Sequence, residues 1–329
     1  MVTIKDVKFK DNFRPKVFVT HNDTPIVGIN LLREKCDVIV SETNSSQETL
    51  DKIKGVDGIY WVSHEKLDGK ILDAAGPQLK VVSTMSVGID YVDVEEFKRR
   101  NLPLGYTPAV LNDAVADIGV GLMLAASRRF HESRLKIDSS QWERRPQWLL
   151  GQEIRNSIVG IVGFGGIGET IAKRLTGFDV AKFLYCGHNK KKSAEKYNAK
   201  FVPFMELVAE SDFIIIICPL TDETRKLFNS EVFSKMKKTS VLINIARGDI
   251  VDQDALYEAL KNNQIFAAGV DVTSPEPLPA DHKLLTLPNF YITAHLGSAT
   301  VKTRNDMSLL GAMNILCGLA GEPLNEAAY

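Results

Sequence analysis

Three polar residues in the second half of the chain carry chemically complementary side chains. Arg247 stands in Asn-Ile-Ala-Arg-Gly-Asp, Glu276 in Ser-Pro-Glu-Pro and His295 in Ala-His-Leu-Gly-Ser. A guanidinium can hold a carboxylate with two hydrogen bonds, and an imidazole can move a proton near neutral pH. A carboxylate can hold that imidazole in one tautomer and favour its protonated form. Together these are the groups needed to reduce a 2-keto acid.

Each of these residues follows an apolar run that predicts a buried parallel strand, over Ser240–Ala246, Ala267–Asp271 and Phe290–Thr293. Taken singly, the arginine fits a surface ion pair, the glutamate a solvated loop charge and the histidine a satisfied, half-buried side chain. Open α/β sheets bind ligands at the carboxyl ends of their strands. The common position of the three residues therefore favours one shared site.

A glycine-rich turn follows another predicted strand, which begins at Ile158. Gly163, Gly165 and Gly168 form the pattern Gly-x-Gly-x-x-Gly, and the residues after them have helical apolar spacing. The first glycine makes the tight turn, the second lets the backbone approach a pyrophosphate, and the third lets helix and strand pack closely. The helix N-terminus supplies N–H groups for the phosphates. The turn, with Gly166 and Ile167 inside it, predicts a dinucleotide site.

The segment after the second strand of this series bears on the choice of cofactor. NAD sites place Asp or Glu here to hold the ribose 2′-hydroxyl. The segment Gly187–Lys192 has no acidic residue, whereas His188, Asn189, Lys190 and Lys191 can all donate to a 2′-phosphate. This composition predicts NADPH, with NADH used less well. No arginine fork is present, and a run of lysines also fits a solvated helix start.

The order of the predicted elements indicates an α/β fold with two doubly wound parallel-sheet domains. A first βαβ series occupies residues 16–107, and a second, with six strands, occupies residues 158–293. The first series is predicted to have strands at Val17–Val19, Val38–Val40, Gly58–Val62, Lys80–Ser83 and Leu102–Leu104, and the second at Ile158–Val162, Ala181–Cys186, Phe213–Cys218, Ser240–Ala246, Ala267–Asp271 and Phe290–Thr293.

Because the glycine turn lies in mid-chain, we expect a Rossmann cofactor domain inserted into a flavodoxin-like substrate domain. The substrate domain is predicted to be discontinuous, with residues 1–109 and 297–329, and the dinucleotide-binding domain to span residues 110–296. A long helix, Ser298–Leu319, returns to the first domain. Residues 110–155 hold a helix rich in small residues and a loop with Trp142 and Trp148, predicted to form a dimerisation helix and arm; a surface loop with buried tryptophans is the alternative.

Composition limits the classes of function. The 329 residues are 44% hydrophobic and 25% charged, with a net charge of −1, so nothing indicates binding to nucleic acid or anionic membranes. No apolar run reaches the roughly 20 residues of a membrane span, and residues 1–15 have no signal or transit pattern. The four cysteines lack metal-ligand spacing. We expect a cytoplasmic enzyme with reduced thiols and no metal.

Several motifs resemble the D-2-hydroxyacid dehydrogenase family over nearly the whole chain, and within it the glyoxylate/hydroxypyruvate reductases. The motifs are Gly163–Gly168, Asn244–Gly248, Ser274–Pro277 and Ala294–Thr300, with Leu72–Gly76, Ser83–Asp90, Gly105–Pro108 and Asp271–Pro279 suggesting the subgroup. The resemblance implies NADPH-dependent reduction of glyoxylate and hydroxypyruvate to glycolate and D-glycerate by a homodimer.

The resemblance also implies roles for individual residues. Arg247 would bind and polarise the substrate, His295 would be the acid/base and Glu276 would orient it. Backbone N–H groups of Val87 and Gly88 would meet the substrate carboxylate, and Trp148 would reach a neighbouring subunit's site. The cofactor would be bound by Gly163, Gly165, Gly166, Ile167, Gly168, His188, Asn189, Lys190, Lys191, Pro219, Ile245, Arg247, Asp271, His295 and Gly297.

Two alternatives stay open. A D-lactate or D-3-phosphoglycerate dehydrogenase would share the fold and the three catalytic residues, although such enzymes usually have the acidic residue that this chain lacks after its second strand. Transcriptional corepressors that resemble these dehydrogenases bind peptides and sense a nucleotide, and they too can keep the arginine, glutamate and histidine. We expect no long disordered tail of the kind that interaction proteins carry.

Overall fold

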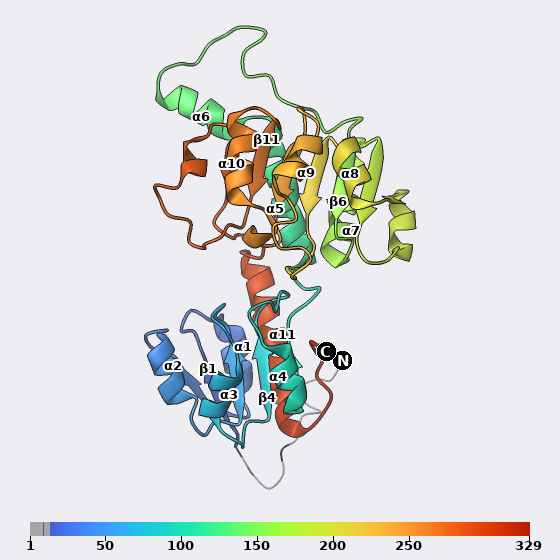
Figure 1. The fold of residues 1–329 in the computed structure, drawn as a ribbon. Helices are drawn as coiled ribbons and strands as arrows, with labels where there is room; N and C mark the ends of the chain where they lie inside the picture. Colours follow the sequence, from blue (N-terminus) through green and yellow to red (C-terminus); the bar gives the residue numbers. More distant parts are fainter. Residues whose placement is uncertain (1–8, 10–13) are drawn as a thin grey trace. The chain divides into compact units, whose positions relative to one another are not determined.

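The computed structural model describes residue 9 and residues 14–329. Most of residues 1–15, for which no signal or transit pattern was predicted, lies outside the described residues. The chain divides into two compact units. Unit 1 contains Met1–Leu111 and Thr300–Tyr329, and unit 2 contains Asn112–Ala299. The unit boundaries lie at 111/112 and 299/300, whereas the sequence predicted domain boundaries at 109/110 and 296/297. Figure 1 traces both units along the chain.

Unit 1 is built on a five-stranded parallel sheet in the order β2-β1-β3-β4-β5, the strand order of flavodoxin-like folds. Its buried core includes Phe18, Trp61 and Phe97. The strands are β1 (Lys16–Val19), β2 (Asp37–Val40), β3 (Gly58–Trp61), β4 (Val81–Thr84) and β5 (Leu104–Gly105), and the helices are α1 (Ile26–Arg33), α2 (Ser46–Lys52), α3 (Gly69–Ala75), α4 (Val94–Arg99) and α11 (Val301–Ala320).

The C-terminal helix α11 belongs to unit 1. It packs against α1 and against strands β3 and β4. Gly28 permits the contact with α1, since a Cβ atom at this position would lie 2.3 Å from Oγ of Ser308. The helix begins three residues later than predicted because Thr300 caps it, its side chain accepting a hydrogen bond from the N–H of Thr303.

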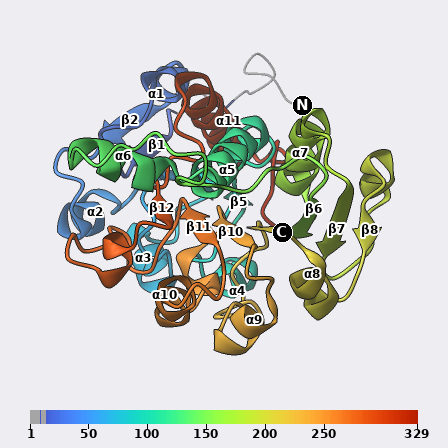
Figure 2. The same cartoon turned by 90° about the horizontal axis from the view of Figure 1, so that it is seen from above.

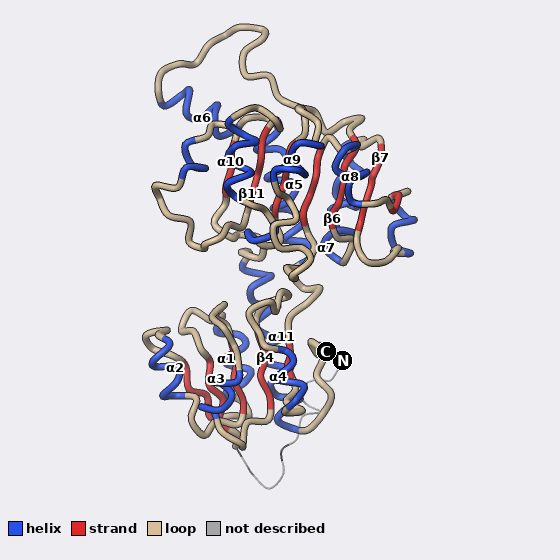
Figure 3. Tube along the Cα trace, in the orientation of Figure 1, coloured by secondary structure: helices blue, strands red, loops and turns tan. Residues whose placement is uncertain are grey.

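Unit 2 is built on a seven-stranded parallel sheet in the order β12-β11-β10-β9-β6-β7-β8, with helices on both sides of the strands (Figures 2 and 3). The strands are β6 (Ile158–Val162), β7 (Lys182–Cys186), β8 (Lys200–Phe201), β9 (Phe213–Ile216), β10 (Val241–Asn244), β11 (Ala267–Val270) and β12 (Phe290–Ile292). The helices are α5 (Asn112–Ser127), α6 (Phe130–Asp138), α7 (Gly166–Leu175), α8 (Phe204–Glu210), α9 (Ser230–Lys235) and α10 (Gln253–Lys261), with short 3₁₀ helices at Thr176–Phe178, Lys192–Tyr197, Gly248–Ile250 and Lys283–Thr286.

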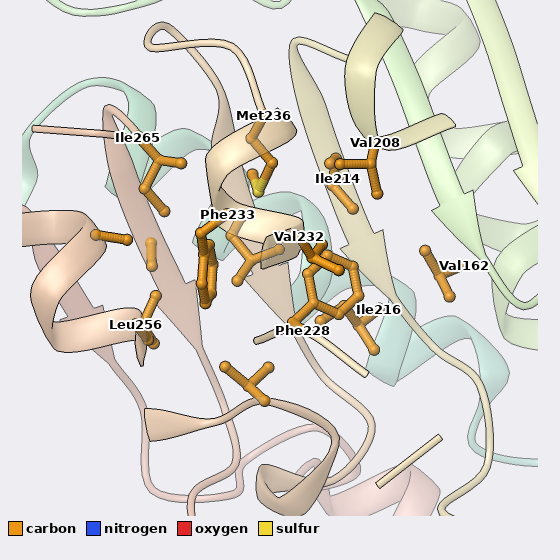
Figure 4. Close-up of a cluster of buried hydrophobic side chains, with 14 of the residues drawn as sticks. Val162, Val208, Ile214, Ile216, Phe228, Val232, Phe233, Met236, Leu256 and Ile265 are labelled. Carbon is orange, nitrogen blue, oxygen red and sulfur yellow. The ribbon is translucent and has the colours of Figure 1, made fainter. Parts of the chain in front are cut away.

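A large apolar core lies between α8, α9, α10 and the sheet of unit 2. Phe228, Phe233 and Met236 are buried in it beside Ile214 and Ile216 of β9 (Figure 4). Such burial stabilises a domain by about 25 cal/mol per Å² of apolar surface removed from water. This core secures the central strands, whose ends carry the candidate site.

The sequence prediction of six strands in this sheet was wrong, because β8 adds a seventh. β8 is a two-residue edge strand, Lys200–Phe201, that pairs with β7, and so short a pair carries no recognisable apolar pattern. Helix α6 was also not predicted. None of its nine residues is buried, so it has no apolar stripe directed toward a core.

The small residues of α5 serve packing inside unit 2. The helix contacts α7 and strands β10, β11 and β12. Ala116 and Ala126 are buried, and a Cβ atom on Gly119 would lie 2.9 Å from Cδ1 of Ile245. These contacts account for the composition of α5 without a second copy, and its role in a dimer stays a prediction.

Candidate active site

Four strands of unit 2 end at the edge of the sheet where the candidate residues lie. Strands β6, β10, β11 and β12 are parallel members of one sheet, so their carboxyl ends share that edge. The glycine turn follows β6, Arg247 follows β10, Glu276 follows β11 and His295 follows β12. The strand order reverses between β6 and β9, which is where such sheets bind dinucleotides.

The glycine turn has the shape that a pyrophosphate requires. Gly163 has a φ of 97°, and a Cβ atom there would lie 2.9 Å from the backbone of Cys218. A Cβ on Gly168 would lie 2.6 Å from the carbonyl oxygen of Gly163, while nothing lies within 4 Å of the corresponding point at Gly165. Helix α7 starts at Gly166 with no side-chain cap, so its first N–H groups are available to an anion. These features fit a nicotinamide dinucleotide.

His295 and Glu276 form a direct pair. Nδ1 of His295 lies 2.8 Å from Oε2 of Glu276, and their side chains are 39% and 38% exposed. The N–H of Thr273 donates to the other carboxylate oxygen at 2.8 Å. Partial burial opposes ionisation of Glu276, but these hydrogen bonds and the charge of Arg247 outweigh it, so the pKa of the carboxyl is lowered. The glutamate is therefore ionised at neutral pH, as a partner of an imidazolium must be.

Asp271 organises the loop that carries the histidine. Its carboxylate is 2% exposed and accepts hydrogen bonds from Thr293 Oγ1 at 2.5 Å, the N–H of Leu296 at 2.8 Å and the N–H of Gly297 at 2.7 Å. The N–H of His295 donates to the carbonyl oxygen of Asp271 at 2.9 Å. His295 has a φ of 53°, which is uncommon for a residue other than glycine. The aspartate therefore holds a backbone conformation that aims the imidazole at Glu276.

Arg247 is held at the end of β10 by a buried neighbour. Asn244 is buried, and its Nδ2 donates to the carbonyl oxygen of Arg247 at 2.9 Å. Nη1 of Arg247 donates to the carbonyl oxygen of Ala246 at 2.8 Å. The charge of this arginine contributes to the lowered pKa of Glu276, which places a cation near the histidine pair.

Two residues join the arginine loop to the glutamate loop. A Cβ on Gly248 would lie 2.0 Å from the carbonyl carbon of Thr273, so only glycine fits there. Gln253 clamps the backbone of Ser274, donating to its carbonyl oxygen at 2.5 Å and accepting from its N–H at 3.0 Å. Sequence reasoning missed Gln253 and Thr273, because neither residue type carries a signal of this role in a single sequence.

The segment expected at the 2′-phosphate is open to solvent. All residues from Gly187 to Lys192 are exposed. The N–H of Lys191 donates to the hydroxyl of Tyr185 at 2.9 Å, and this ring packs between Phe164 and Phe201. A 3₁₀ helix begins at Lys192, so both a phosphate contact and a solvated helix start remain compatible with the lysines.

Two further expected cofactor contacts follow strands at the same edge. Pro219 comes shortly after β9, and its carbonyl oxygen accepts a hydrogen bond from the hydroxyl of Thr224 at 2.7 Å. Ile245 directly follows β10 and is buried. Their contacts with a cofactor stay predictions.

In unit 1, Val87 and Gly88 lie in the turn after β4. The hydroxyl of Ser86 donates to the carbonyl oxygen of Gly88 at 2.8 Å and lies 2.8 Å from the hydroxyl of Tyr91. The side chain of Val87 is exposed. The turn is thus ordered by its own residues, and its contact with a substrate carboxylate stays a prediction.

The arm after α6 is mostly exposed. Trp142 is 65% exposed and Trp148 is half-buried, so the alternative of a loop with two buried tryptophans is wrong. The reach of Trp148 into a neighbouring subunit stays a prediction.

Within residue 9 and residues 14–329, no three His, Cys, Asp or Glu side chains are grouped to hold a metal ion, and no helix has the length and apolarity of a membrane span. All four cysteines are unpaired, and Cys36, Cys186 and Cys317 are buried.

The family model for the NAD-binding domain of D-isomer-specific 2-hydroxyacid dehydrogenases matches residues 120–297. The chain belongs to this family. Human glyoxylate reductase/hydroxypyruvate reductase is 47% identical to it over 316 residues, 94% of this chain and 96% of the relative. Glyoxylate reductase of Thermofilum pendens is 42% identical, over 94% of this chain and 93% of the relative.

Solved structures agree with this membership in the D-2-hydroxyacid dehydrogenases. The NADPH-dependent glyoxylate/hydroxypyruvate reductase of Sinorhizobium meliloti, solved with NADP and malonate, has a TM-score of 0.85 at 30% identity, covering 96% of this chain and 97% of that one. The TT0316 protein of Thermus thermophilus has a TM-score of 0.87 at 34% identity, covering 95% and 100%. The predicted family and α/β fold are confirmed, and the protein is an NAD(P)-dependent oxidoreductase.

Proposed function

We propose that this D-2-hydroxyacid dehydrogenase uses NADPH to reduce glyoxylate to glycolate and hydroxypyruvate to D-glycerate. The observation that carries the proposal is the His295–Glu276 pair at 2.8 Å, near the charge of Arg247 and on the sheet edge that holds the glycine turn. The human relative, at 47% identity, is named as a reductase of both substrates, and the Thermofilum pendens relative, at 42% identity, as a glyoxylate reductase, which supports the assignment.

The site residues divide the reaction between them. The bound cofactor supplies a hydride to the keto carbon. Nδ1 of His295 is engaged with Glu276, so we assign the proton transfer to the carbonyl oxygen to Nε2, and hydride plus proton complete the alcohol. Glu276 stabilises the imidazolium before the transfer. Arg247 holds the substrate carboxylate in this scheme.

The preference for NADPH rests on Gly187–Lys192. This segment offers exposed donors and no carboxylate that would repel a 2′-phosphate. His188, Asn189, Lys190 and Lys191 are the proposed contacts. A fold neighbour from Sinorhizobium meliloti whose name describes it as NADPH-dependent supports this choice. We place the reaction in the cytoplasm, which the four unpaired cysteines support.

A homodimer is part of the proposal. Helix α6 has no buried residue, yet Phe130, Leu135 and Ile137 on it are large and exposed, as is Trp142 after it. We propose that a second copy of the chain covers this apolar surface. The same interface would bring Trp148 to the active site of the neighbouring subunit. Sedimentation should give twice the monomer mass, and Leu135→Lys with Ile137→Lys should shift it to the monomer. A monomeric parent protein would contradict this part.

Steady-state kinetics tests the function directly. The rate of reduction is measured with NADPH and with NADH for four substrates: glyoxylate, hydroxypyruvate, pyruvate and 3-phosphohydroxypyruvate. We expect the highest kcat/KM for one of the first two with NADPH, and D-glycerate as the product from hydroxypyruvate. A higher value for pyruvate or 3-phosphohydroxypyruvate would assign a different dehydrogenase. Cofactor binding without turnover of any substrate would favour a nucleotide-sensing corepressor.

A further inference from the structure

Asn112 places a carboxamide against the first residue of the glycine-turn helix. It is the first residue of α5, and Gly166 is the first residue of α7. A Cβ atom on Gly166 would lie 2.5 Å from Nδ2 of Asn112, 3.2 Å from its Cγ and 3.4 Å from its Oδ1. The carboxamide therefore fills the space into which a side chain at position 166 would project.

The start of α5 is locked to α7, so the position of this carboxamide is set by the fold. Arg174 of α7 donates to Asp113 at 2.6 Å and to Asp117 at 2.7 Å, both in the first turns of α5. The two helices pack side by side (Figure 2). The guanidinium of Arg174 pairs with both aspartates and neutralises part of their negative charge. The side chain beside Gly166 is the uncharged amide of Asn112.

The carboxamide of Asn112 is half-buried, and within residues 14–329 it makes no hydrogen bond to another residue. An amide has two N–H donors and an acceptor, and in a half-buried residue these can exchange a water partner for a ligand. The end of α7 beside it also has no side-chain cap, and the space at Gly165 is open. The amide of Asn112 on α5 and the first N–H groups of α7 therefore lie close together beside Gly166.

We infer that Asn112 donates a hydrogen bond to the pyrophosphate of the dinucleotide, an inference that rests on the cofactor site of the proposed function. Gly166 then has a role beyond the turn, because its missing side chain makes room for this donor. The amide of Asn112 adds one uncharged hydrogen-bond donor to the pyrophosphate. Its contribution to the binding free energy adds to that of the N–H groups of α7.

Binding of NADPH in the absence of substrate tests the inference, followed by the fluorescence of the bound nicotinamide. Asn112→Ala should raise the Kd for NADPH and for 2′-phospho-ADP-ribose by about tenfold, the worth of a hydrogen bond to a charged group. Asn112→Asp keeps the shape but faces the phosphates with a carboxylate, so it should raise Kd more, and added salt should reduce the difference. Asn262→Asp, at the far end of α10, is the matched control and should bind as the parent does.

A double-mutant cycle separates the carboxamide from a general effect on the turn. Gly166→Ala should raise Kd in the parent because the new Cβ displaces Asn112, and it should have little further effect in the Asn112→Ala background. Equal effects of Gly166→Ala in both backgrounds, or Asn112→Asp binding like the parent, would overturn the inference. Kd values that depend on Asn112 in a protein that does not reduce glyoxylate would support the inference while the proposed substrate fails.

Discussion

Nδ1 of His295 lies 2.8 Å from Oε2 of Glu276, although the two residues follow different strands of unit 2. The second carboxylate oxygen is held by the N–H of Thr273 at 2.8 Å. With both oxygens hydrogen-bonded, the carboxylate is held in one orientation, and Nδ1 of His295 is directed toward it. Under the proposed function, this arrangement positions His295 to donate the proton.

The charge of Glu276 should support reduction at neutral and mildly acidic pH. Glu276→Gln should lower kcat/KM because the neighbouring imidazole loses the carboxylate that orients it and stabilises its charged form. The pKa of Glu276 is lowered from its ordinary value of 4.5, so the carboxylate stays ionised down to below that pH. The parent should therefore lose no activity through protonation of Glu276 above about pH 4.5. Profiles of kcat/KM against pH check both points, and a parental kcat/KM in Glu276→Gln would refute the pairing.

His295→Ala should lower kcat by about 10² to 10⁴-fold, the usual contribution of a positioned acid/base. The Kd for NADPH should change much less than kcat, although His295 is an expected cofactor contact, because the loop is held by Asp271 through backbone N–H groups that this substitution leaves in place. Stopped-flow and binding measurements separate the two quantities. A variant with a near-normal kcat would remove His295 from the mechanism.

Arg247→Lys keeps the positive charge but loses the planar pair of donors, so we expect a higher KM and a lower kcat together. Arg225→Lys is the control, since Arg225 is an exposed arginine paired with Asp249 at 2.9 Å in the same unit. The control should retain parental kinetics. If Arg247→Lys retains them as well, the substrate carboxylate is bound elsewhere.

Asp271→Asn should weaken both stability and activity. The carboxylate accepts from Thr293, Leu296 and Gly297, and an amide would turn one N–H donor toward another. A buried donor without an acceptor costs about 1–3 kcal/mol, and displacement of His295 should lower kcat/KM. Urea unfolding and kinetics measure the two effects. Asp281→Asn, on an exposed residue, should change neither. Parental stability in Asp271→Asn would show that the loop does not depend on this carboxylate.

Lys190→Ala with Lys191→Ala should lower the NADPH/NADH ratio of kcat/KM by about tenfold or more, since a phosphate contact with a charged donor is worth roughly 1.5–3 kcal/mol. Adding His188→Asp should lower it further. His188 is chosen because Gly187 has a φ of 158°, which disfavours a side chain. Lys235→Ala with Lys238→Ala removes two exposed lysines elsewhere in unit 2 and should leave the ratio unchanged. An unchanged ratio in the first variant would make the lysine run a solvated helix start.

The sequence by itself determined the parts of this protein that depend on local chemistry. A glycine turn between a β-branched strand and an amphipathic helix is a local pattern. The three candidate catalytic side chains could be recognised because polar residues follow apolar strands. The mid-chain position of the turn also predicted that the first domain is discontinuous. Elements without a local pattern were missed: β8 has two residues, and α6 buries none of its side chains.

Only the tertiary structure decided how distant residues meet. Three contacts join loops that are separate in the sequence. His295 pairs with Glu276, Gln253 hydrogen-bonds the backbone of Ser274, and Gly248 lies against the backbone of Thr273. Sequence spacing does not encode such contacts, because they depend on which strands are neighbours in the sheet and on how closely their loops pack. The carboxamide of Asn112 beside Gly166 is of the same kind: neither residue indicates a phosphate contact until α5 and α7 are packed together.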